Sequence, residues 1–280
     1  MAEAAEALGY RGLCVLGSFG FEEFRYTSGM MRVLGLVLWG VVAWGQKPSD
    51  AETAALIERS RQKALDYTQQ LPDFMCTEVV HRSISSDGGR QANDILTIKL
   101  GYSKRGEEHK LELINGKPTN SKYADLEGAT STGQFGGILR VIFNPASQGA
   151  FDWQSWKTVR KKRLAVLEYA VSAANSPYYL GHQGRKAIVG LHGVLEVDSE
   201  TGEVLRLTYV AYDIPQQLGV DSAVNSVDYA FSDVGGREYL LPVHSEMEIR
   251  SPGVLARNKT EFREYRKFSA ESVVDFGVGK

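Results

Sequence analysis

The chain has 280 residues, of which 43% are hydrophobic and 10% aromatic, a composition that is typical of a folded protein and excludes general disorder. Its 32 Lys and Arg residues against 34 Asp and Glu residues give a formal net charge of −2. With this balance the protein as a whole has no positive electrostatic field that would attract nucleic acid or an anionic membrane. A charged partner therefore has to be recognised by a local group of residues.

The first 45 residues predict export. Residues 30–45 read MMRVLGLVLWGVVAWG, in which one cation, Arg32, precedes an uncharged apolar run that closes with Ala43-Trp44-Gly45. This is the pattern of a signal peptide cleaved before Gln46, and the run is shorter than the roughly 20 residues of a transmembrane anchor. We interpret residues 1–29 as an upstream extension, the alternative being a genuine long n-region or a small extra element. The mature protein is then expected to be periplasmic or secreted.

Residues 49–52 predict the start of a helix. The sequence Ser49-Asp50-Ala51-Glu52 is a capping box, in which the serine hydroxyl and the glutamate side chain each satisfy a free backbone N–H. Ala and Leu on one side and charged residues on the other continue the helix to Leu71-Pro72-Asp73, where the proline ends it.

After Pro72 the hydrophobic period changes from near four to two, which indicates half-buried antiparallel strands. Ser199-Glu200-Thr201-Gly202 is the turn of the clearest hairpin, because glycine supplies the positive φ of a short loop. The apolar positions of the alternating segments are the candidate ligand-binding residues on one face of the sheet. They are Leu96, Ile98, Leu100, Tyr102, Leu111, Leu113, Leu205, Leu207, Tyr209, Tyr229, Phe231, Leu241, Val243 and Met247.

One segment in the middle breaks the strand pattern. Residues 128–149 hold a loop rich in Gly, Ser and Thr and then the apolar stretch Ile138–Phe143 before Asn144-Pro145, which favours a short helix packed across the sheet. Residues 46–280 contain no repeat and no low-complexity linker, so we predict a single domain. The fold class is α+β, mainly antiparallel β, with about eight to ten strands in a strongly curved sheet or half-barrel that carries the N-terminal helix and the short helix.

Polar residues give weaker indications of function. A basic run of Lys157, Arg160, Lys161, Lys162 and Arg163 is a candidate surface patch for phosphate or lipid headgroups, although a solvated strand edge or turn explains it more simply. The five histidines have no second His or Cys at metal-ligand spacing, so no metal and no cofactor is predicted. The common motifs for nucleophilic catalysis and for nucleotide binding are also missing from the sequence.

The segment GVLEVDSETGEVLRLTYVAYDIP, followed by VDYAFSDVGGREYLLP, resembles the periplasmic lipoprotein-carrier (LolA-like) superfamily in a chain that begins with a signal peptide and a long helix. The resemblance covers residues 187–249 best. It implies a half-open β-barrel covered by helices and a role in carrying lipoproteins or sensing envelope stress. The LPDFMC segment also resembles one found in exported bacterial proteins.

Three hypotheses follow for the function. The leading one is a non-catalytic exported binding protein whose concave sheet holds a lipid-like or lipoprotein ligand. The second is an envelope protein-interaction or structural module with a filled core, acting through a sheet edge or the basic run. The third is a hydrolase with a spatially assembled site of His and carboxylates. The expected partners are lipid, lipoprotein or an envelope protein, and no nucleic acid.

Overall fold

The computed structural model describes residues 13–14, 47–123, 126, 129–130 and 133–268. The predicted signal peptide lies outside these residues, as does the predicted upstream segment apart from Leu13–Cys14. No helix of the described residues is long and apolar enough to cross a membrane.

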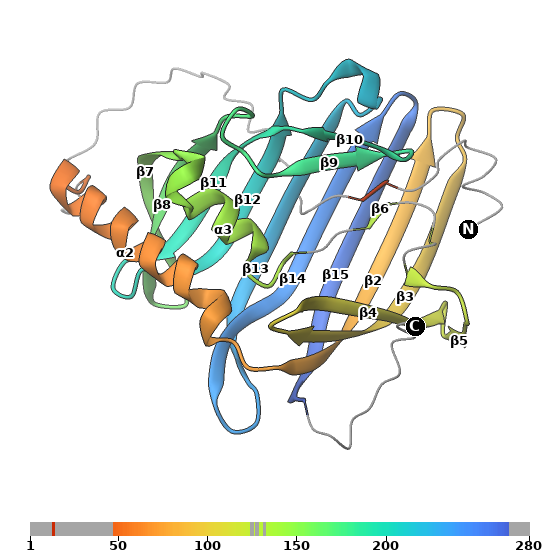
Figure 1. Ribbon diagram of the computed structural model, residues 1–280, viewed down its shortest axis with the longest axis horizontal. Coiled ribbons are helices and arrows are strands. Elements are labelled where there is room, and N and C mark those ends of the chain that lie inside the picture. The colour runs from red at the N-terminus through yellow and green to blue at the C-terminus, as the bar shows by residue number, and fades with distance from the viewer. Residues whose placement is uncertain (1–12, 15–46, 124–125, 127–128, 131–132, 269–280) are drawn as a thin grey trace, which may run out of the picture.

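An eleven-stranded antiparallel sheet, with strand order β5-β4-β3-β2-β15-β14-β13-β12-β11-β8-β7, forms the body of the molecule (Figure 1). Its strands are β2 (Phe74–Ser86), β3 (Gln91–Ser103), β4 (Gly106–Ile114), β5 (Lys117–Pro118), β7 (Ala150–Val159), β8 (Lys162–Val171), β11 (Gly190–Asp198), β12 (Val204–Tyr212), β13 (Ser222–Asp233), β14 (Glu238–Ser251) and β15 (Val254–Lys267). The two edge strands, β5 and β7, are not paired with each other, so the sheet stays open. The predicted fold class is confirmed, with one strand more in this sheet than the upper expectation.

The cover on one face of the sheet consists of two helices and a small second sheet (Figure 1). The helices are α2 (Asp50–Gln70) and α3 (Gly137–Phe143), with short 3-10 turns at Pro145–Ser147 and Gln216–Leu218. The small sheet has the order β10-β9-β1-β6, with β1 (Leu13–Cys14), β6 (Ala129–Thr130), β9 (Tyr179–His182) and β10 (Arg185–Ile188). We call the sheet face beneath these elements the covered face and the opposite one the outer face.

Both helices were predicted from local chemistry. The side chain of Ser49 accepts from the backbone of Glu52, and the Glu52 carboxylate accepts from the Ser49 backbone N–H at 2.8 Å, which confirms the capping box. α3 buries Ile138, Leu139 and Ile142 against the sheet, as its apolar positions predict. A helix on this face closes off apolar surface that a strand would have left open to water.

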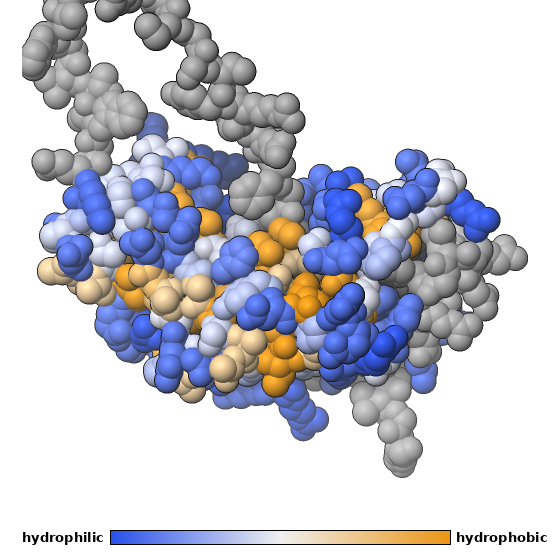
Figure 2. Space-filling view, turned by 90° about the horizontal axis from the view of Figure 1, so that it is seen from above, coloured by the Kyte–Doolittle hydropathy of each residue, from blue (hydrophilic) through white to orange (hydrophobic). Residues whose placement is uncertain are grey.

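The main core lies between the covered face and its cover. It joins Leu56 of α2 and Ile142 of α3 to residues of the central strands, such as Leu195 and Val227. Figure 2 views the molecule from above, at right angles to Figure 1, and shows apolar residues in the middle of this end of the molecule with hydrophilic residues around them. The apolar interior therefore reaches the surface on this side.

Candidate ligand-binding site

The covered face brings together most of the apolar residues that alternation predicts. Ten of the fourteen are buried, and they belong to three neighbouring clusters. Leu207, Tyr209, Tyr229 and Met247 lie in the main core, Leu100, Tyr102 and Leu241 lie near the C-terminal end of α2, and Leu96, Ile98 and Leu111 lie on β3 and β4.

Three predicted residues fall at strand irregularities, which simple alternation does not anticipate. In the pairing of β11 with β12, Glu196 faces Arg206 but Val197 faces Val204, so Leu205 has no partner and is only half-buried. Val243 is left without a partner in the same way between β13 and β14. A bulge adds one residue to a strand and exchanges the faces of the residues beyond it.

Leu113 shows the consequence of such an exchange. Leu111 faces Ile98, whereas Leu113 faces Thr97, because the pairing of β3 with β4 shifts between these two positions. Ile114 takes the place opposite Leu96 instead and packs against the cluster on β3 and β4. Leu113 therefore does not share the face of Leu111. The remaining predicted residue, Phe231, is 46% exposed.

Phe231 lines a cleft between α2 and the ends of β13 and β14. Its walls also include Tyr67 of α2, Leu71 directly after it, Leu139 of α3 and Leu240 of β14. The charged side chains that line it are Lys63, Glu203, Arg237 and Glu238. The cleft has a volume of about 170 Å³, which is below the roughly 300–1,000 Å³ of typical small-molecule pockets. A ligand with an acyl chain therefore requires α2 to move away from the sheet.

The contact of α2 with the rest of the molecule is small and partly polar. Among its described side chains, Leu56, Ser60 and Ala64 are the buried ones. The Arg61 side chain donates to the Phe143 carbonyl at 2.8 Å, and the Arg59 side chain donates to the Ser199 carbonyl at 3.2 Å. Two of these three side chains are small, and Ile57 and Tyr67 add partly buried contacts with the core, so few large side chains hold α2 on the sheet.

Polar groups of the covered face lie within this apolar interior. Asn225 is 0% exposed, and in the described part of the chain neither atom of its side-chain amide has a hydrogen-bond partner. The Tyr67 hydroxyl is likewise buried without a partner there, and burial raises its pKa, so it stays neutral. An unpaired buried polar group costs about 1–3 kcal/mol, which a carbonyl or hydroxyl of a bound ligand would offset.

Titratable groups also lie inside, but their geometry does not form a catalytic set. His109 Nε2 lies 3.7 Å from Glu78 Oε2, beyond hydrogen-bond reach, and both side chains are almost fully buried. Burial lowers the pKa of His109 to about 4 and raises the pKa of Glu78. Among the described residues no group of three or more His, Cys, Asp or Glu side chains could hold a metal ion.

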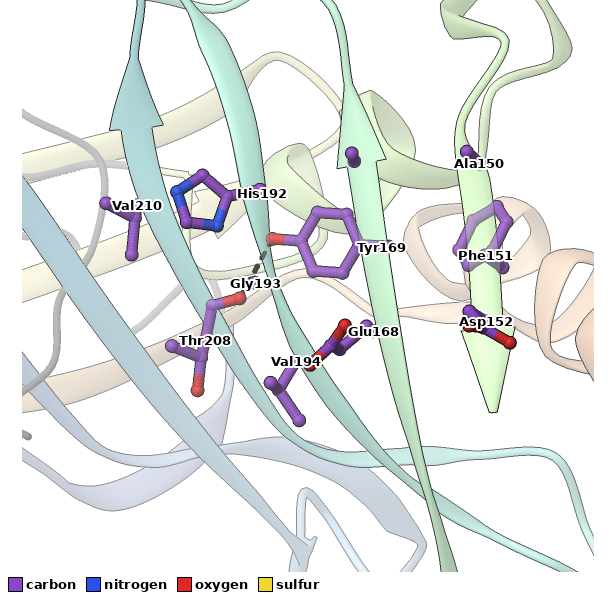
Figure 3. Close-up of a pocket in the computed structure, with 11 residues that line it drawn as sticks. Ala150, Phe151, Asp152, Glu168, Tyr169, His192, Gly193, Val194, Thr208 and Val210 are labelled. Atoms are coloured by element: carbon purple, nitrogen blue, oxygen red, sulfur yellow. Dashed lines mark hydrogen bonds between the residues drawn. The ribbon is translucent and has the colours of Figure 1, made fainter. Parts of the chain in front are cut away.

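The outer face has a shallow depression over β7, β8, β11 and β12 (Figure 3). Asp152, Glu168 and His192 line it and alternate along their strands with residues that face the core. Gly193 lies at its centre, where the Tyr169 hydroxyl reaches across to donate to the Thr208 carbonyl at 2.9 Å. All the lining residues belong to strands, and the polar side chains among them do not point toward a common centre. We therefore do not take this depression as the candidate site.

The basic run forms the hairpin of β7 and β8. Arg160 and Lys161 occupy the turn with φ values of 48° and 70°. Lys157 pairs with Glu196 at 2.8 Å and Lys162 pairs with Asp198 at 3.0 Å, while the Arg163 guanidinium lies 3.7 Å from the centre of the Trp156 ring. Three of the five cations therefore have partners within the sheet. This arrangement fits the simpler interpretation of the run as a strand edge and turn.

No family model matches the sequence, and no curated protein matches it. Solved structures with similarity over most of the chain include a DUF1329 family protein from Desulfovibrio piger (11% identity, 80% of this chain and 97% of that chain, TM-score 0.42). They also include a LolA superfamily protein from Nitrosomonas europaea (9%, 77% and 93%, TM-score 0.36) and the lipoprotein LppX from Mycobacterium tuberculosis (9%, 77% and 97%, TM-score 0.27). One of these matches is thus a member of the LolA superfamily, the group named by the sequence resemblance.

Proposed function

We propose that this protein binds a lipid-like, amphiphilic ligand between the covered face and α2, without catalysing a reaction on it. The observation that carries the proposal is the combination of a large apolar face with a helix that covers it through a small contact. Removing α2 uncovers the cleft at Phe231 and the apolar cluster around Leu139 and Tyr229. The unpaired groups of Tyr67 and Asn225 favour a ligand that has polar atoms beside its acyl chain.

We further propose that the protein works outside the cytoplasm, on the basis of the signal-peptide pattern at residues 30–45. In that compartment an acyl chain that leaves a membrane needs shelter from water, because each buried CH₂ group is worth about 0.8 kcal/mol. The ligand is then a free lipid or the acyl part of a lipoprotein.

The test is to fix α2 on the sheet with a disulfide. A Cβ placed on Gly202 would lie 3.3 Å from Cβ of Arg59, slightly closer than the spacing of about 3.5–4.5 Å in natural disulfides. Because φ of Gly202 is +79°, G202C is expected to cost some stability, which the single variant G202C measures. The double variant R59C/G202C, in a Cys14→Ser background, is therefore expected to form a bond between α2 and the turn of β11 and β12. The native Cys76 is 2% exposed and does not compete for the bond.

The oxidised double variant is expected to take up a fluorescent fatty acid at least about tenfold more slowly than the wild type, and dithiothreitol is expected to restore the rate. The single variants R59C and G202C are the matched controls and should bind as the wild type does. Uptake by the fully oxidised variant at the wild-type rate would rule out entry beneath α2.

The second candidate function is a protein-interaction module with a filled core. It is favoured by the burial of ten of the fourteen predicted apolar residues while α2 lies on the sheet. In that case neither the oxidised nor the reduced protein takes up the fatty acid. Both forms should then be captured equally by a protein partner in crosslinking.

A further inference from the structure

The turn between β3 and β4 lies near the C-terminal end of α2 (Figure 1). Residues of this turn, of α2 and of the segment before α3 line a second depression. Its volume is about 790 Å³, and it opens widely to solvent. The lining residues are Gln69, Tyr102, Ser103, Lys104, Arg105, Gly106, Glu107, Gly133, Phe135, Gly137 and Arg140. We call this depression the basic pocket.

Three exposed cations line the basic pocket, namely Lys104 and Arg105 from the strand turn and Arg140 from α3. Among the residues that the structure describes, no acid lies within ion-pair distance of any of them. Some exposed cations elsewhere on the sheet do have such partners, as Arg257 has in Glu248 at 2.8 Å. The positive charge of this pocket is therefore available to a ligand.

The acid of the pocket, Glu107, does not neutralise these cations. Its Oε2 atom accepts the Gly133 backbone N–H at 2.9 Å, so the carboxyl group is engaged in holding the loop before α3. Burial raises its pKa. Asp73 and Glu108 line a neighbouring depression together with Lys104 and Arg105, but they do not line the basic pocket.

The apolar side of the pocket is formed by aromatic residues of the interior. Tyr102 and Phe135 line it, and their ring centres lie 5.8 Å apart within the aromatic cluster that also contains Phe74 and Phe262. Three cations therefore lie next to a buried aromatic cluster at one end of the covered face. This arrangement fits a molecule with an anionic head and an apolar tail. Two arginines suit a phosphate especially well, because a guanidinium binds its oxygens in pairs.

We infer that the basic pocket binds a phosphate-type anion, and that this anion is the headgroup of the ligand carried on the covered face. The inference rests on the proposed function and adds to it the chemical class of the ligand. Arg105 and Arg140 hold the phosphate oxygens from opposite elements, and Lys104 adds a third charge. The chain of the ligand then extends past Tyr102 and Phe135 beneath α2.

The experiment compares a fluorescent monoacylglycerol phosphate with the monoacylglycerol of the same chain, using the whole protein at low salt. The wild type is expected to bind the phosphate-bearing probe about tenfold more tightly, and added salt should reduce the difference. R105Q/R140Q is expected to bind both probes equally, with the affinity for the neutral probe unchanged. The control R160Q/K161Q removes two exposed charges from the turn between β7 and β8 and should keep the preference.

Equal binding of the two probes by the wild type, or a preference that survives in R105Q/R140Q, would overturn the inference and leave acyl binding intact. If neither probe binds, the proposed function fails. Titration with inorganic phosphate then shows whether the basic pocket binds an anion at all. Phosphate binding that R105Q/R140Q abolishes would support the site with a free anion as its ligand. No phosphate binding by the wild type would remove the site altogether.

Discussion

The carboxyl group of Glu78 lies inside the protein, on the apolar face of β2 between Cys76 and Val80. Burial and the nearby Glu107 raise its pKa, so the folded protein holds this proton to a higher pH than the unfolded chain does. The contribution of Glu78 to stability is therefore complete below the ordinary glutamate pKa of 4.5 and is lost as the pH rises through the folded-state value.

Glu78→Gln is expected to stabilise the protein at neutral pH, because glutamine cannot ionise. The difference in the free energy of unfolding from the wild type should be small below pH 4.5 and should grow to about 1 kcal/mol or more at pH 7. Urea denaturation over this pH range measures it. Glu108→Gln, at an exposed position of β4, is the control and should change stability by less than about 0.5 kcal/mol. A lower stability of Glu78→Gln at pH 7 would show that the ionised form of Glu78 is favourable.

Single residues are where prediction from the sequence is weakest. Glu78 and Arg82 occupy inward positions of β2, and Arg82 is satisfied there by two hydrogen bonds to Asp94, at 2.8 and 2.6 Å. Alternation predicts the positions of these residues, but the partner of Arg82 comes from the next strand and depends on register. Asn225 likewise shows no sign in the sequence that its amide is fully buried.

At the scale of elements, the strands and both helices follow from the sequence, and the bulges do not. The period-two pattern places Leu96 to Tyr102 and Leu207 to Tyr209 correctly on the covered face. A bulge adds one residue without a local sequence signal, so alternation does not anticipate where Leu113 and Leu205 lie. Bulges also bend strands and increase their twist, which gives the sheet its curvature.

The close approach of β11 and β12 provides a test of strand packing. A Cβ on Gly193 would lie 2.1 Å from the Thr208 carbonyl oxygen, which cannot move without disturbing the strand. Gly193→Ala is therefore expected to lower the free energy of unfolding by about 2–4 kcal/mol in urea denaturation.

The matched control is Gly137→Ala at the start of α3, where a Cβ would meet nothing within 4 Å. This substitution should be neutral or stabilise the protein by up to about 1 kcal/mol, because alanine favours helix. Equal effects of the two substitutions would contradict the close strand contact at Gly193.

At the scale of the whole molecule, the class of fold and the order of its main elements are predictable, but the cover is not. The hairpin of β9 and β10 and the path of the loop before α3 depend on contacts between distant segments, such as the hydrogen bond from Asn258 to the Ala129 carbonyl. The basic pocket also assembles from three separate elements. The sequence shows the basic run at residues 157–163 more readily, because charges adjacent in sequence are easier to recognise than charges that folding brings together.

The central claim is that an amphiphilic ligand occupies the space between the covered face and α2. Native mass spectrometry of the protein purified from its own cell envelope measures this directly. The account predicts a population heavier than the bare chain by the mass of one phosphate-bearing lipid, which is lost on organic extraction and regained on adding that lipid back. A protein that is always at its bare mass, and that stays so after incubation with acyl phosphates, would contradict the account.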